Sequence, residues 1–263
     1  MVKILLLKTT LQNSIVIINL RCQKEITLGE FKSFARSSIG RKVFMSLTGL
    51  FLCLFLVEHL IGNLLLLVSK DMFNVYSHFL SHNPIIRTVE IVLFASIIMH
   101  IGLSMILTVR NRNARPVAYA LYKGSSNSQW TSRNMFVLGS ILFIFLVIHL
   151  SNFFVKARFG GVESYALQEQ VGFFGLVFPP GSEIHDIYSV VIHSFKELWY
   201  TALYVVCMVA LSLHLLHGFQ SGFQSAGVYS ITPKSLIRKI GLAFAILIPL
   251  GFAFIPVYIY LMK

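Results

Sequence analysis

Five long apolar stretches dominate the chain, and shorter polar segments separate them. They run roughly over residues 43–68, 84–109, 134–155, 198–220 and 240–262. An α-helix needs about 20 predominantly apolar residues to cross the hydrocarbon core of a bilayer, and each stretch reaches that length. Transmembrane β-strands are about half as long. The pattern therefore predicts an all-α membrane protein with five transmembrane helices, the first four forming a bundle.

The segments between these stretches carry signals of their own. Residues 69–83 alternate polar and aromatic side chains, which predicts an interfacial helix. Pro84 follows Asn83 and suits the first position of the second span. Residues 156–185 contain Gly-Gly and Pro-Pro-Gly and predict a long exterior loop. Residues 185–197 are amphipathic and are expected to extend the fourth span along the interface.

The N-terminal region differs from the rest of the chain. Its apolar stretches are short and are broken by polar residues, and no small-residue cleavage site follows them, so it is a poor signal peptide. We expect residues 1–36 to form a cytoplasmic N-terminal extension, interfacial or partly disordered. Residues 37–263 are expected to form the five-helix transmembrane domain.

Composition and charge agree with a membrane protein and give an orientation. Charged residues make up 12% of the chain, against about 25% in soluble domains. The net charge of +12 does not indicate nucleic-acid binding, because the basic residues flank the apolar stretches. Eight Lys and Arg precede the first span, five lie between the second and third, and three between the fourth and fifth. The positive-inside rule then predicts a cytoplasmic N-terminus and an exterior or periplasmic C-terminus in a bacterial inner membrane.

Histidines lie unusually deep in the first four spans, whereas the fifth span has none. They are His59, His100, His149, His214 and His217. Ionisable residues are rare inside membranes and indicate function. At 1.5 Å per residue, His59 and His149 lie about 26 and 24 Å from the cytoplasmic edge, and His100 about 15 Å. His214 and His217 fall in the inner part of the fourth span. The depths predict an outer pair, His59 with His149, and an inner pair, His100 with His214 or His217.

Two stacked pairs of histidines on four helices are what two bis-histidine haems require. Glycines near the histidines (Gly62, Gly102 and Gly218) permit close approach of a flat macrocycle, but they equally suit ordinary helix packing. A single membrane histidine can also serve as an interhelical hydrogen-bonding group. Copper or zinc is a further alternative, although no Asp, Glu or Cys joins the pairs at ligand spacing, and zinc prefers a tetrahedral set. The three cysteines form no CxxC or CxxCH motif, so covalent c-type haem is not indicated.

Several motifs together resemble one family. They are SSIGRKVFMSLTGLFLCLFLVEHLIGNL (37–64), NVYSHFLSHNP (74–84), IIMHIGLSM (97–105), LVIHLSNFF (146–154) and LHLLHGFQSGFQSAG (213–227). In sequence and order they resemble the dihaem cytochrome b membrane-anchor subunit of succinate dehydrogenase and fumarate reductase (succinate:quinone oxidoreductase), of the single-chain five-helix type. The resemblance covers residues 37 to about 260.

The resemblance implies two haem b groups with one axial ligand on each of the first four helices. Matching the motifs places the outer haem between His59 and His149 and the inner haem between His100 and His217. His214 is then a neighbour of the inner haem. Depth alone does not separate His214 from His217, so this choice rests on the family pattern. Some fumarate reductases of the family carry a Glu two residues before the fourth ligand for transmembrane proton transfer, whereas this chain has Leu215 there.

The resemblance also implies partners and a role in the respiratory chain and the tricarboxylic acid cycle. The family's anchor binds an FAD flavoprotein subunit and an iron–sulfur subunit on the cytoplasmic side and passes electrons between them and a membrane quinone. The chain has no flavin or cluster motif of its own, so it is expected to serve as one subunit of the enzyme and not to oxidise succinate alone. The direction of the reaction is not readable from the sequence.

Candidate residues for quinone binding lie near the outer pair of histidines. They are Glu58, Asn63, His78 and Asn152; His82 is close to His78 in the interfacial stretch. For each of them, contact with the surface or with lipid headgroups is the competing interpretation. Two other functions stay open: a dihaem cytochrome b of another quinone-linked dehydrogenase, and a non-haem membrane transporter. Glu58 is the only acidic residue well within a span, which disfavours a transporter built on buried charge pairs.

Overall fold

The computed structural model describes residues 29–114, 129–173 and 175–262. It divides into two compact units, residues 1–44 and 45–263, which are described separately. In the first unit residues 29–36 are helical, and the Ser37 hydroxyl accepts a hydrogen bond from the backbone N–H of Gly40 at the start of the next helix. The predicted extension of residues 1–36 lies largely outside the described residues and stays a prediction.

Five helices are long and apolar enough to cross a membrane, as the sequence predicted. The spans are α2 (Ser38–Leu64) with a short 3-10 turn η1 (Leu65–Leu67), α4 (Pro84–Asn113), α7 (Met135–His149) with its continuation, α10 (Leu198–Ser225) and α11 (Lys234–Leu261). The continuation of α7 is a π-helical segment, η2 (Leu150–Val155), followed by α8 (Lys156–Phe159). The helices support a multi-pass membrane protein, while the orientation of its termini stays a prediction.

The predicted helix starts are confirmed at the outer connection. The interfacial stretch forms α3 (Lys70–His82). Asn83 then caps α4, because its side-chain oxygen accepts hydrogen bonds from the backbone N–H groups of Ile85 (2.9 Å) and Ile86 (3.3 Å), and Pro84 is the first helical residue. These contacts satisfy N–H groups that have no partner within the helix.

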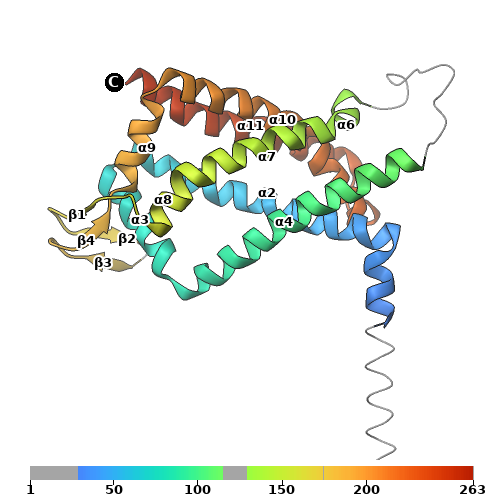
Figure 1. Ribbon diagram of the computed structural model, residues 1–263, viewed down its shortest axis with the longest axis horizontal. Coiled ribbons are helices and arrows are strands. Elements are labelled where there is room, and N and C mark those ends of the chain that lie inside the picture. Colours follow the sequence, from blue (N-terminus) through green and yellow to red (C-terminus); the bar gives the residue numbers. More distant parts are fainter. Residues whose placement is uncertain (1–28, 115–128, 174, 263) are drawn as a thin grey trace, which may run out of the picture. The chain divides into compact units, whose positions relative to one another are not determined.

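The expected exterior loop contains four short strands that the sequence analysis did not predict. Two antiparallel pairs form: β1 (Ser164–Ala166) with β4 (Glu183–His185), and β2 (Val171–Phe173) with β3 (Leu176–Phe178). They enclose a small apolar cluster of Val75, Leu167 and Ile184. The expectation of an all-α protein is therefore corrected in this segment. Figure 1 shows the strands gathered with α3 at one end of the helices, whereas α6 (Trp130–Arg133) lies at the other end.

A helix precedes the fourth span, as expected, but it is a separate element. This helix, α9 (Ile187–Phe195), is capped by the Asp186 side chain. Glu197 then adopts an extended conformation and breaks the chain direction before α10 begins. The predicted continuous extension of the fourth span is thus wrong at this junction.

The fourth and fifth spans form the most closely packed pair of helices. Figure 1 shows α10 and α11 side by side along their length. Gly241 permits this approach, because a Cβ atom there would lie 2.8 Å from the Phe219 ring. α2 is joined to α10 by a buried hydrogen bond of 2.5 Å from the Ser46 hydroxyl to the carbonyl of Gly222. Small residues therefore set the contacts between spans, as is usual in membrane proteins.

The exterior elements are tied together by one buried side chain. Asn74 of α3 is fully buried and donates hydrogen bonds to the Tyr165 hydroxyl (3.3 Å) and to the Asp186 carboxylate (3.1 Å). The side-chain oxygen Oδ1 of Asn74 accepts a hydrogen bond from the backbone N–H of Tyr188 (2.9 Å). Lys70 forms a 2.5 Å ion pair with Asp186. We call this set of residues the exterior cap network, after the side of the membrane on which the charge distribution predicts it; it joins α3, β1 and α9.

The exterior cap network should be sensitive to acid through Asp186. Burial alone would raise the pKa of its carboxyl, but hydrogen bonds from Lys70, Ser189 and Asn74 outweigh burial and hold the pKa below its ordinary value. The stabilisation is therefore present above the unfolded-state pKa of about 3.9 and is lost as the pH falls through the lower folded-state pKa. We expect pepsin cleavage within residues 163–190 to rise as the pH is lowered through this range.

The matched variants are Asp186→Asn and Glu183→Gln, the latter removing an exposed carboxylate on β4. Asp186→Asn should raise cleavage at the upper end of pepsin's pH range and flatten its pH dependence, whereas Glu183→Gln should follow the unmodified protein. Equal pH profiles for all three proteins would show that Asp186 does not hold the cap together.

Candidate functional site

The outer pair of histidines meets inside the bundle. The rings of His59 on α2 and His149 on α7 have centroids 5.7 Å apart and stand at 88° to each other. Aromatic rings surround them: Phe55 stacks on His59 and Phe145 on His149. Phe252 of α11 also lies with its ring centroid 5.6 Å from that of His59. Two imidazoles from different helices thus face each other in apolar surroundings.

The inner pair is formed by His100 on α4 and His214 on α10. Their ring centroids are 6.4 Å apart, at an interplanar angle of 64°. Glycines line this place: a Cβ atom on Gly49 would lie 3.2 Å from Cε1 of His100, and one on Gly139 would lie 3.9 Å from Cε1 of His214. Within the described residues, Nδ1 of His214 is buried and has no hydrogen-bond partner. A buried polar atom without a hydrogen-bond partner costs stability unless a bound group contacts it.

His217 is not the residue that meets His100. It lies three residues beyond His214 on α10, about 4.5 Å further along the helix. Among the described residues the ring contact with His100 is made by His214. The ring contact is thus with His214, while His217 as a haem ligand stays a prediction of the family resemblance. The structure does not test whether any of these histidines binds a metal.

The two pairs lie at different levels, and three helices give the same separation. On α10, Tyr204 contacts His149 and His214 contacts His100, ten residues apart. On α7, Gly139 faces His214 and His149 follows ten residues later. On α2, Thr48 contacts His100 and His59 follows eleven residues later. At 1.5 Å per residue the levels are about 15 to 16 Å apart.

A chain of hydrogen bonds holds the His149 ring. Its Nδ1 lies 3.1 Å from the Tyr204 hydroxyl, and that oxygen lies 3.1 Å from the Tyr200 hydroxyl. Asn152 donates to the hydroxyls of Tyr200 and Ser194, each at 2.9 Å. Both tyrosines are buried. Metal-ligating histidines typically hand their other ring N–H to such a partner, which fixes the ring orientation.

The sequence analysis missed both tyrosines. Their spacing of four residues places them on one face of α10, one helical turn apart, fourteen and ten residues before His214. Tyrosines near the end of a span are ordinary in the aromatic belt of membrane proteins. The spacing of the two tyrosines was therefore only a weak indication that they contact His149.

The other two rings have simpler supports. Nδ1 of His100 lies 3.3 Å from the buried Thr48 hydroxyl of α2. Asn63 donates a 2.7 Å hydrogen bond to the carbonyl of His59, and its amide nitrogen lies 3.4 Å from both ring nitrogens of that residue. Asn63 therefore braces His59 from one turn further along α2.

The four candidate quinone residues do not form one site. Asn63 and Asn152 lie beside the outer pair, as described above. Glu58 is exposed on α2, about 100° around the helix from His59, and accepts a hydrogen bond from the Tyr76 hydroxyl. Burial and the neighbouring Glu58 raise the pKa of Tyr76. In the described part of the chain no hydrogen bond joins any two of the four candidates.

His78 lies in α3, apart from the other three candidates. Its ring stacks on His82 with centroids 4.0 Å apart, and Phe178 of β3 packs against its edge. Burial lowers the pKa of His78, and the nearby His82 and His185 lower it further. His78 is thus part of the exterior cap, and among the described residues its ring contacts are with His82 and Phe178.

Comparison with known proteins gives no family. No protein-family model matches the chain, and no curated protein sequence matches it either. The function must therefore be argued from the site.

The side chains available as metal ligands limit which kind of metal group the site could hold. Across residues 29–114, 129–173 and 175–262 no cluster of three or more His, Cys, Asp or Glu side chains is arranged to hold a metal ion. A tetrahedral zinc site needs four ligands. Two separate imidazole pairs instead suit a group that brings its own equatorial donors and needs only two axial nitrogens.

The space beside His100 depends on Gly49. Because its Cβ would already lie 3.2 Å from the ring, we expect Gly49→Leu to displace His100 and to destabilise the protein. Overpacking of this kind typically costs about 1–3 kcal/mol. The measurement is thermal unfolding of the purified protein in detergent. Gly102→Leu is the control, since a Cβ there meets nothing within 4 Å; equal effects of both variants would contradict the packing argument.

Proposed function

We propose that this chain is the dihaem cytochrome b membrane anchor of a succinate:quinone oxidoreductase. The observation that carries the proposal is the meeting of His59 with His149 and of His100 with His214 at two levels of one helix bundle. Each pair draws on two different helices, and all of the first four spans contribute. Resemblance in the motifs around these histidines supports the choice of family.

The residues present fit two haem b groups. Two imidazoles on opposite sides of one metal ion have ring centroids about 6 Å apart, because each metal–nitrogen bond is about 2 Å long. The centroid distances of 5.7 and 6.4 Å agree with this. We assign His59 and His149 to the outer haem and His100 and His214 to the inner haem.

The chain's own residues orient the axial ligands and exclude water. Bound here, haem b supplies one-electron carriers at two depths of the membrane. Tyr204 and Thr48 accept the Nδ1–H of His149 and His100, so that the opposite ring nitrogen is free to bind a metal. Gly49 and Gly139 leave space beside the inner pair, and phenylalanines shield the outer pair.

The two ends of the bundle suit different partners. Asn63 and Asn152 lie beside the outer pair, which favours reaction with a membrane quinone at this end. Basic residues gather at the opposite end: Arg110, Arg112, Arg133, Lys234, Arg238 and Lys239. This charge suits an acidic protein surface, and we place the iron–sulfur and flavoprotein subunits there. By the positive-inside rule it is the cytoplasmic end.

Replacement of single histidines tests the haem assignment. We expect a b-type absorbance with two components in a redox titration of membranes. His59→Ala or His149→Ala should remove one component, and His100→Ala or His214→Ala the other, because each haem loses an axial ligand. His217→Ala is the matched control and should keep both. Loss of a component in His217→Ala but not in His214→Ala would restore the ligand that the resemblance implied.

The same preparation distinguishes the remaining functions. Absence of any b-type absorbance would contradict the proposal and favour a transporter. Haem without two co-purifying soluble subunits of the flavoprotein and iron–sulfur kinds would favour the anchor of another quinone-linked dehydrogenase.

Tyr204 should tune the outer haem without binding it. Removing its hydroxyl deprives the Nδ1–H of His149 of an acceptor and makes the ligand less basic, so we expect Tyr204→Phe to raise the midpoint potential of the outer component. Loss of such a partner typically weakens metal binding about 10- to 100-fold. Tyr200→Phe should have a smaller effect, because the contact between His149 and Tyr204 remains. Tyr258→Phe on α11 is the unrelated control, and a shift in the inner component instead would contradict the assignment.

A further inference from the structure

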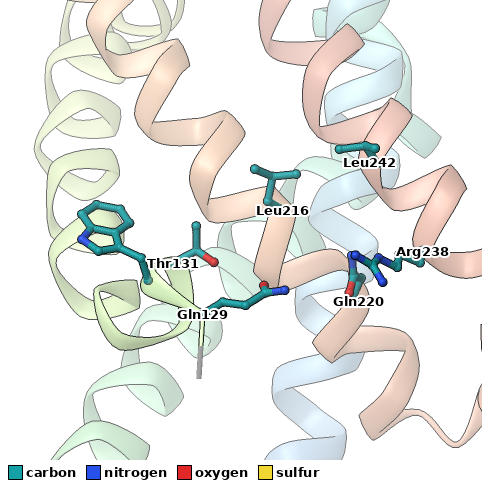
Figure 2. Close-up of a pocket in the computed structure, with 7 residues that line it drawn as sticks. Gln129, Thr131, Leu216, Gln220, Arg238 and Leu242 are labelled. Atoms are coloured by element: carbon teal, nitrogen blue, oxygen red, sulfur yellow. The ribbon is translucent and has the colours of Figure 1, made fainter. Parts of the chain in front are cut away.

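A pocket of about 330 Å³ lies at the end of the bundle opposite the exterior cap. Figure 2 shows polar side chains from three elements converging on it, with Leu216 and Leu242 on the apolar side. The polar ones are Gln129 and Thr131 at α6, Gln220 on α10 and Arg238 on α11. Trp130 lies at the rim and is 55% exposed.

This pocket is separate from the histidine pairs. Gln220 lies six residues beyond His214 on α10, about 9 Å further from the middle of the bundle. α6 precedes α7, and Arg238 lies near the start of α11. The pocket therefore sits where the spans end, at the depth of lipid headgroups.

The helices around the pocket carry positive charge, and the described elements that line it carry no acidic residue. The sequence contains no Asp or Glu between residues 91 and 162 and none after Glu197. No carboxylate therefore lies on α6, α10 or α11. In the described part of the chain the ion pairs are Lys70 with Asp186 and Arg87 with Glu90, so Arg238 has no acidic partner there. Its guanidinium is available to an anion.

We propose that this pocket binds the phosphate of an anionic phospholipid. Arg238 pairs with the phosphate, because a guanidinium forms strong charge-assisted hydrogen bonds with phosphate oxygens. The amides of Gln129 and Gln220 and the Thr131 hydroxyl donate further hydrogen bonds to the headgroup. The acyl chains lie along Leu216 and Leu242. Basic pockets between spans on the cytoplasmic side bind such headgroups in other membrane proteins. The site does not depend on haem.

The experiment titrates the full-length, delipidated protein in detergent with phosphatidylglycerol or with phosphatidylcholine of the same acyl chains. Bound lipid is counted by native mass spectrometry. We expect phosphatidylglycerol to bind more tightly than phosphatidylcholine, and Arg238→Gln to weaken its binding about fivefold or more. Lys239→Gln, the neighbouring cation that does not line the pocket, should bind like the unmodified protein.

Two further arms keep the proposal open to refutation. Leu216→Trp fills the apolar side without changing the charge and should also weaken binding; if this variant does not fold, the Arg238→Gln and Lys239→Gln comparison still decides. Inorganic phosphate should not displace the lipid, and displacement would show a free-phosphate site instead. Equal binding of the two lipids, equal binding by Arg238→Gln and the unmodified protein, or displacement by a neutral quinone analogue would each overturn the proposal.

Discussion

The meeting of imidazole rings across an apolar bundle is the constraint on which the rest of this structure depends. A buried ring nitrogen without a hydrogen bond is costly, so each histidine inside a span needs a partner. Thr48 and Tyr204 satisfy one nitrogen of His100 and of His149. Nδ1 of His214 stays without a partner among the described residues. The bundle brings two such rings together at each of two levels, at interplanar angles of 88° and 64°.

The two pairs are positioned by opposite means. The outer pair is held by hydrogen bonds that reach the exterior elements, because Asn152 connects the end of α7 to Ser194 of α9 and to Tyr200 of α10. The π-helical segment that follows His149 contributes to this, since its wider turn changes the direction of the side chains after it. The inner pair depends instead on missing side chains, at Gly49 and Gly139. Polar contacts fix the outer pair, whereas close backbone approach makes room for the inner one.

The sequence predicted the spans, and two depths for their histidines, because membrane helices follow simple rules. A span satisfies its own backbone hydrogen bonds and rises 1.5 Å per residue, so flanking charges fix the depth of each histidine. Depth does not distinguish His214 from His217, because the two lie less than one helical turn apart. Which of them contacts His100 depends on the direction of each side chain around α10. That direction depends in turn on how α10 packs against α4 and α7. The three-residue strands escaped prediction because they are too short to show an alternating pattern.

The charged residues are distributed unequally between the two ends of the helix bundle. Carboxylates from Glu58 onward lie at the outer level or beyond it, on α2, α4 and the exterior elements, whereas α10 and α11 carry none. The outer end carries acidic and amide side chains, among them Glu58, Asn63 and Asn152. The ends of α4, α6 and α11 on this side carry basic residues and no carboxylate, which attracts anions from solution, from lipid and from protein surfaces alike. A phospholipid held by Arg238 would neutralise one of these charges at the membrane surface. Lys234 and Lys239 on the same helix and the basic residues of α4 would remain for a protein partner, so that lipid and partner share one basic surface.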